Sequence, residues 1–144
     1  MKKILLAINA DNPVRTRAAV EEAIRIYERE QATVHLLNVQ PLVSGHAAMC
    51  FAPGELRGMQ LAAGQEDLRP AETLLAAAGV PYVSRVMVGR SAETIARAAS
   101  ELGCDRILVG EVPSAPLGSR IFGSLAQQLR HLVASTGGCE VIGS

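Results

Sequence analysis

The feature that most constrains the fold is a regular alternation of short apolar runs with longer segments of helical periodicity. Between the runs, small and apolar residues recur every three or four positions, as on one face of a helix. Strands that alternate with helices predict an open parallel sheet, because parallel neighbours need long crossover connections, and helices then cover both faces. The predicted strands are 3–8, 33–39, 82–88, 106–109 and 139–142. The first predicted helix follows residue 12, the second spans 55–78, the third spans 91–102, and the last includes 125–133.

Several residues mark where the helices begin or break. Asn12 can cap the first helix, with Pro13 at its first helical position, and Ser91 can cap the third. Pro70 lies inside the second helical pattern, so we expect a kink or a break just before it. The stretch 40–55 has the glycine and prolines of a loop.

The composition indicates one ordinary globular domain, residues 1–144. Hydrophobic residues make up 49% of the chain, and 14 basic residues balance 14 acidic ones. Without a basic excess, and with only two Tyr, two Phe and no Trp, the chain lacks the charge and the stacking surface that nucleic-acid binding needs. We therefore expect no nucleic-acid partner.

The sequence also favours a cytoplasmic location. The apolar run Ile4–Ile8 after "MKK" is too short for the apolar region of a signal peptide, and it fits an opening strand. No segment approaches the roughly 20 uninterrupted apolar residues of a membrane-spanning helix. Three scattered cysteines without metal-ligand spacing are typical of reduced thiols. We expect no membrane association and no metal.

Signatures of catalysis are missing. The chain contains no G-x-S-x-G, H-E-x-x-H, GxGxxG or Walker GK[ST] motif. His35 falls within a predicted strand and is expected to be packed there, while His131 is expected on the solvated face of the last helix. These observations favour a binding protein over an enzyme and identify no catalytic residue.

A ligand pocket is expected where the carboxyl ends of the strands meet at the reversal of strand order. The segments 9–12, 39–42, 88–90 and 110–124 would build it. The last of these, in "VGEVPSAPLGSRIFGS", leads to Ser124 just before a predicted helix, where free N–H groups and the helix dipole attract an anion. The alternative is that Ser124 only caps that helix.

The stretches "MKKILLAIN", "VGRSAETIARAASELGCDRILVG" and "FGSLAQQLRHLVASTGGCEVI" resemble the universal stress proteins, and the resemblance spans the chain. It implies a Rossmann-like sheet of the adenine nucleotide alpha hydrolase type. An ATP-binding branch of that family carries G-x2-G-x9-G-[ST] after the fourth strand. Here Gly110, Pro113, Gly123 and Ser124 take these positions, so proline replaces the second glycine, which removes an N–H donor and restricts φ.

The resemblance shows a second departure at the end of the first strand. ATP-binding members usually carry an aspartate there that engages the adenine end of the nucleotide, and this chain has Asn9. Asparagine can still donate and accept hydrogen bonds, so recognition is weakened rather than lost. Glu111 beside the phosphate loop would also repel a triphosphate.

The resemblance, with its departures at Asn9 and Pro113, implies two alternative functions. The first is a stress-response binding and interaction module with an impaired nucleotide site, acting through an unidentified protein partner and requiring no cofactor. The second is a protein that binds ATP or AMP, or a very slow ATPase. The nucleotide site would be lined by Asn9, Val39, Gly110, Gly118, Gly123 and Ser124.

The last strand predicts the assembly. Val141 and Ile142 are expected on an exposed sheet edge, whose unpaired backbone groups can pair with another chain. The resemblance implies a homodimer through this strand, since universal stress proteins commonly pair it across a two-fold axis. Glu140 stands where proline is usual, and two such carboxylates brought together would repel each other.

Overall fold

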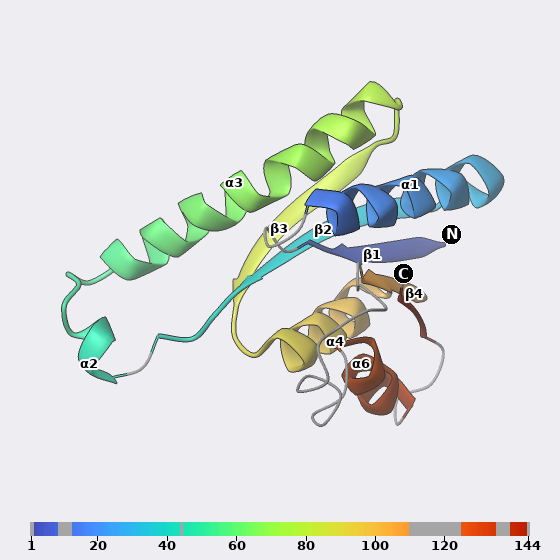
Figure 1. Ribbon diagram of the computed structural model, residues 1–144. Helices are drawn as coiled ribbons and strands as arrows, with labels where there is room; N and C mark the ends of the chain where they lie inside the picture. The colour runs from blue at the N-terminus through green and yellow to red at the C-terminus, as the bar shows by residue number, and fades with distance from the viewer. Residues whose placement is uncertain (1, 9–12, 44, 110–124, 135–138, 144) are drawn as a thin grey trace.

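The computed structural model describes residues 2–8, 13–43, 45–109, 125–134 and 139–143 (Figure 1). Strands and helices alternate along this part of the chain, and the N-terminal strand lies in the middle of the sheet. The elements are β1 (Lys3–Ala7), α1 (Pro13–Glu30), β2 (Thr33–Gln40), α2 (Gly45–Ala48), α3 (Glu55–Ala77), β3 (Tyr82–Val88), α4 (Ser91–Leu102), β4 (Arg106–Val109), α6 (Leu125–Ala134) and β5 (Glu140–Gly143).

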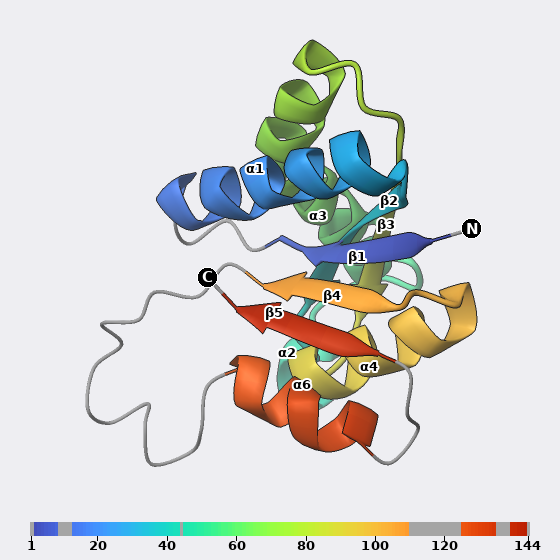
Figure 2. The same ribbon diagram turned by 90° about the vertical axis from the view of Figure 1, so that its right-hand side faces the viewer.

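All neighbouring strands of this sheet are parallel, in the order β3-β2-β1-β4-β5. In the register, Leu6 of β1 lies between Leu36 of β2 and Leu108 of β4. Figure 2 shows the strands running in one direction, with β1, β4 and β5 side by side. The predicted fold class, an open five-stranded parallel sheet with helices on both faces, is confirmed.

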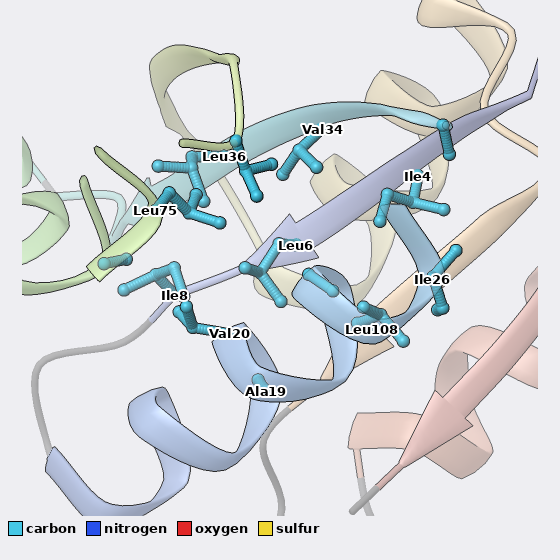
Figure 3. Packing of buried hydrophobic residues seen from close by; sticks show 14 of the residues in the cluster. Ile4, Leu6, Ile8, Ala19, Val20, Ile26, Val34, Leu36, Leu75 and Leu108 are labelled. Carbon is cyan, nitrogen blue, oxygen red and sulfur yellow. The ribbon is translucent and has the colours of Figure 1, made fainter. Parts of the chain in front are cut away.

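Alternation along each strand divides the core into two layers. On β1, Leu6 belongs to a cluster with α1 and α3, whereas Leu5 belongs to a cluster with α4 and α6. Figure 3 shows the first cluster, in which Leu75 of α3 lies beside Leu36 of the sheet. Such strands bury both faces, which is why their sequences read as continuous apolar runs.

Helix α3 is not broken at Pro70, because it runs as one element from Glu55 to Ala77. Proline removes the hydrogen bond to the carbonyl of Glu66, one turn earlier. Both Pro70 and Glu66 are exposed, so water can bond to that carbonyl. On the buried side, Leu68, Ala71 and Leu75 pack against the core and hold both halves of the helix on the sheet.

Three further expectations are corrected by the structure. Ser91 is the first residue of α4 rather than its cap; Arg90 takes the cap position in extended conformation, without a side-chain cap hydrogen bond. The stretch predicted as a loop contains the short helix α2. Val141 is buried against the α4 and α6 layer, since alternate residues of an edge strand still face the core, while Ile142 is half-buried. The expected cap at Asn12 lies outside the described residues.

Within the described ranges, none of the helices combines the length and apolar character that crossing a membrane requires.

Candidate functional site

The strand order reverses between β1 and β4, and their carboxyl ends lie side by side. Helices α1 and α3, which connect β1 to β2 and β2 to β3, pack on one face, whereas α4 and α6 pack on the other. The register pairs Ala7 with Val109 at the last position of both strands. In doubly wound sheets, ligands bind in the crevice at this reversal. Ile8 and Val109, which directly precede Asn9 and Gly110 in the sequence, are both buried.

Of the predicted nucleotide-site residues, Val39 belongs to the described part. It lies near the carboxyl end of β2 and packs, half-buried, into the α4 and α6 layer with Leu37 and Met87. The predicted pocket segments 39–42 and 88–90 do meet, because Gln40 pairs with Val88 across the sheet. The other predicted site residues lie outside the described part, as do the motif positions discussed with them: Asn9, Gly110, Glu111, Pro113, Gly118, Gly123 and Ser124.

A partly buried polar cluster lies at the same carboxyl-end edge of the sheet, on the α3 side. Asn38 of β2 is only 2% exposed. Its Nδ2 donates to the Ile8 carbonyl at 3.1 Å and to Oδ2 of Asp67 at 3.2 Å. Nε2 of Gln40 donates to Oδ1 of Asn38 at 2.7 Å and reaches Asp67 Oδ2 at 3.5 Å. We refer to Ile8, Asn38, Gln40 and Asp67 as the edge cluster.

The edge cluster lies where β1 separates from β2. The paired register ends at Ala7 and Leu37, and the Ile8 N–H then donates to the Leu37 carbonyl at 2.8 Å. The Ile8 carbonyl accepts its hydrogen bond from the Asn38 side chain. The Asn38 side chain thus supplies the hydrogen bond that the Ile8 carbonyl needs at the last position before the expected pocket. A buried carbonyl without a hydrogen-bond partner would be destabilising.

The carboxyl ends of β2 and β3 are fixed by their own contacts. The Gly89 N–H donates to the Gln40 carbonyl at 3.0 Å, and Gln60 of α3 donates to the Pro41 carbonyl at 2.8 Å. A Cβ at Gly89 would lie 2.4 Å from Oγ1 of Thr94, a buried residue of α4. Glycine is therefore required at this turn by the close approach of the helix.

Among the described residues, the carboxylate with the most strongly shifted pKa lies away from this edge, near the amino ends of the strands. Glu30 at the end of α1 accepts a hydrogen bond from Nη2 of Arg106 at 2.9 Å and also pairs with Lys2. The hydrogen bonds from Arg106 and then Lys2 lower the pKa of Glu30 from 4.5 to about 2. Two strongly basic partners keep this carboxylate ionised, which suits an ion pair joining α1 to β4 rather than proton transfer.

Burial shifts the pKa of one histidine and one cysteine side chain of the sheet layers. Burial lowers the pKa of His35, and the charges of Lys3 and Arg85 lower it further. Its Nε2 is buried and has no hydrogen-bond partner among the described residues. Burial raises the pKa of the Cys104 thiol to about 11, so this thiol is a poor nucleophile near neutral pH.

In the portion of the chain that the structure describes, no group of three or more His, Cys, Asp or Glu side chains is arranged to hold a metal ion. The chemistry that the described edge offers is instead hydrogen bonding from backbone and amide groups.

Sequence reasoning missed the edge cluster. Asp67 lies on α3, 29 residues after Asn38, and no local motif joins them. The one available signal was polar Asn38 between apolar neighbours in a strand otherwise predicted to be buried, since a buried amide requires partners.

The family model described as "Universal stress protein family" matches residues 1–134. A universal stress protein family structure from Burkholderia pseudomallei is 20% identical, with a TM-score of 0.70, and the match covers 99% of this chain and 95% of that one. The Archaeoglobus fulgidus universal stress protein in complex with dAMP is 16% identical, with a TM-score of 0.65 and coverage of 99% and 97%.

A universal stress protein family protein from Arabidopsis thaliana with AMP bound is 18% identical, with a TM-score of 0.63 and coverage of 99% and 90%. The chain matches no curated protein in sequence. The family model spans nearly all of the sequence, and the solved structures share the fold over its whole length. The chain belongs to the universal stress protein family.

Proposed function

We propose that the protein is a cytoplasmic stress-response binding and interaction module whose adenine-nucleotide site is impaired at its phosphate loop. The observation that carries the proposal is the meeting of the β1 and β4 carboxyl ends, directly before Asn9 and Gly110. A nucleotide that occupied this edge would depend on the two segments in which the sequence departs from the ATP-binding pattern. Structural relatives with bound AMP and dAMP support an adenine nucleotide as the ligand class.

The departures act most strongly on the phosphates. Pro113 removes one backbone donor and restricts the loop, and Glu111 adds a negative charge beside it. Repulsion from Glu111 grows with each phosphate charge, so ATP is penalised more than AMP. The protein therefore binds adenine nucleotides weakly, and a monophosphate at least as well as a triphosphate. No nucleotide is required for its fold or for contact with a protein partner.

The experiment restores the missing features. The double variant Asn9→Asp, Pro113→Gly is titrated with ATP by calorimetry beside the unaltered protein. Pro116→Gly makes the same chemical change in the same loop, away from the motif positions, and serves as the matched control. We expect a gain of about tenfold in ATP affinity, or about 1.4 kcal/mol, for the double variant and no gain for the control. Equal gains in both would contradict an impairment that arises at positions 9 and 113.

The alternative is a protein that binds ATP or AMP firmly, or a very slow ATPase. Gly110, Gly123 and Ser124, which match three of the four motif positions, favour it. An extract of the denatured protein separates the two functions. Stoichiometric nucleotide carried through purification supports the alternative, and its absence supports the impaired site.

We also propose a homodimer through β5. This strand lies at one edge of the described sheet, and one side of its backbone pairs with β4. Next to this pairing, the Glu140 N–H donates to the Asp105 carbonyl at 2.9 Å. The opposite edge of β5 has no neighbouring strand in the described sheet, so it can add a strand from a second copy. Since Val141 is buried within its own subunit, the contact would rest on backbone pairing and half-buried Ile142.

A further inference from the structure

We propose that Asp67 is a positioning residue for the nucleotide site, and that it acts through Asn38 on the carboxyl end of β1. The inference rests on the proposed function, because it concerns the strand end that leads into Asn9. It adds helix α3 to the determinants of nucleotide affinity. No motif of the sequence and no departure in the phosphate loop involves this helix.

The contacts form a chain from the helix to the strand end. The carboxylate of Asp67 accepts from Nδ2 of Asn38 at 3.2 Å, and the same nitrogen donates to the Ile8 carbonyl at 3.1 Å. An amide nitrogen has two hydrogens, so Asn38 can make both bonds at once. The opposite orientation of the amide would turn its oxygen toward two acceptors. Asp67, together with the Gln40 amide that donates to Oδ1, thus favours the orientation in which Nδ2 of Asn38 meets Ile8.

A carboxylate suits this position because it only accepts hydrogen bonds. The amide groups of Asn38 and Gln40 converge on its Oδ2, and Gln40 also occupies Oδ1 of Asn38 at 2.7 Å. Hydrogen bonds to an ionised acceptor are stronger than those between neutral groups. Without Asp67, a donor of buried Asn38 loses its partner, and the force that orients the amide toward Ile8 weakens.

The backbone of α3 is brought to the sheet by a glycine one turn before Asp67. A Cβ on Gly64 would lie 2.5 Å from Cγ1 of Val86 and 3.0 Å from Oδ1 of Asn38. The absence of a side chain at this position lets the helix approach closely enough for Asp67 to reach a strand residue. Position 64 and Asp67 therefore both lie close to the Asn38 amide.

The test compares Asp67→Ala and Asp67→Asn with Glu66→Ala. Glu66 is the adjacent acidic residue of α3, and its exposed side chain pairs only with exposed Arg69 at 3.0 Å among the contacts of the described structure. Three quantities are measured for each variant: the carbonyl ¹³C resonance of Ile8, the dissociation constant for AMP, and the urea midpoint of unfolding. The resonance reports the hydrogen bond at Ile8 whether or not nucleotide binds.

We expect Asp67→Ala to shift the Ile8 carbonyl resonance and to weaken AMP binding about fivefold, the effect of one net hydrogen bond. Asp67→Asn keeps an acceptor oxygen without the charge, and should restore part of both quantities. Glu66→Ala should change neither. A role confined to holding α3 on the sheet would lower the urea midpoint and leave the AMP affinity of the folded protein unchanged.

Two outcomes overturn the inference: an unshifted Ile8 resonance in folded Asp67→Ala, or an unchanged AMP affinity beside a shifted resonance. If the alanine variant does not fold, the same two readouts on Asp67→Asn decide. If the unaltered protein binds no AMP at millimolar concentration, the proposed nucleotide site fails and the affinity claim for Asp67 fails with it. The Ile8 resonance would then still decide whether Asp67 positions the strand end.

Discussion

Substituting alanine for glycine should have opposite effects on stability at two positions of α3, Gly58 and Gly64. Gly64 and Gly58 both lie within the helix, where alanine is favoured over glycine by about 1 kcal/mol. A Cβ at Gly58 meets nothing within 4 Å, so Gly58→Ala should stabilise the protein by about 0.5–1 kcal/mol. A Cβ at Gly64 would lie 2.5 and 2.8 Å from the two methyl groups of Val86.

The contact at Gly64 is hard to relieve. Val86 is β-branched, so rotating its side chain replaces one methyl with another, and the third contact, Oδ1 of Asn38, is held by Gln40. Overpacking of this kind costs about 1–3 kcal/mol, which outweighs the helical gain and leaves Gly64→Ala less stable than the unaltered protein by about 1 kcal/mol. The difference between the two variants isolates the packing cost, because the helical contribution cancels.

Urea unfolding followed by circular dichroism measures this difference. With a slope near 2 kcal/mol per molar, the two midpoints should lie about 1 M apart, with Gly64→Ala lower. The measurements are made at one protein concentration, so that any association affects both variants equally. A Gly64→Ala midpoint equal to or above that of Gly58→Ala would refute the close approach of α3 to the sheet.

Two further predictions concern charge. The folded-state pKa of Glu30 is about 2 and lies below the ordinary 4.5, so its contribution to stability is present above pH 4.5 and is lost as the pH falls toward 2. The excess stability of the unaltered protein over Glu30→Gln should therefore shrink across that range in urea midpoints, and a constant difference would contradict the ion pair with Arg106. Light scattering at micromolar concentration should give twice the 15.2 kDa chain mass, and Glu140→Gln should tighten the dimer by about 0.5 kcal/mol by removing like charges; a monomer in both would contradict pairing through β5.

Much of the architecture could be predicted because local sequence determines it. The strands at 82–88 and 106–109 have the predicted bounds. Both are short runs rich in β-branched and apolar residues, and each lies between helical patterns in an alternating chain. The predictions that depended on a single residue, Pro70 or Ser91, were less accurate. Pro70 did not break α3, because apolar packing on the opposite side exceeds the loss of one exposed hydrogen bond. Ser91 entered its helix instead of capping it.

The contacts that shape the site edge could not be predicted from local patterns. Asp67 reaches Asn38, and Glu30 reaches Arg106, only after strands and helices have packed. Of the predicted nucleotide-site residues, Val39 belongs to the described part of the chain. Val39 lies at the expected edge, while the roles of Asn9 and the loop from Gly110 to Ser124 stay predictions.

The central claim is an adenine-nucleotide site weakened at its phosphate loop, and one pair of titrations tests it most directly. The unaltered protein is titrated by calorimetry with AMP and with ATP plus magnesium, in the same buffer and at the same ionic strength. We predict dissociation constants above the low micromolar range for both nucleotides, with AMP bound at least as well as ATP. ATP binding in the low micromolar range or tighter, about −8 kcal/mol or better, would contradict the account.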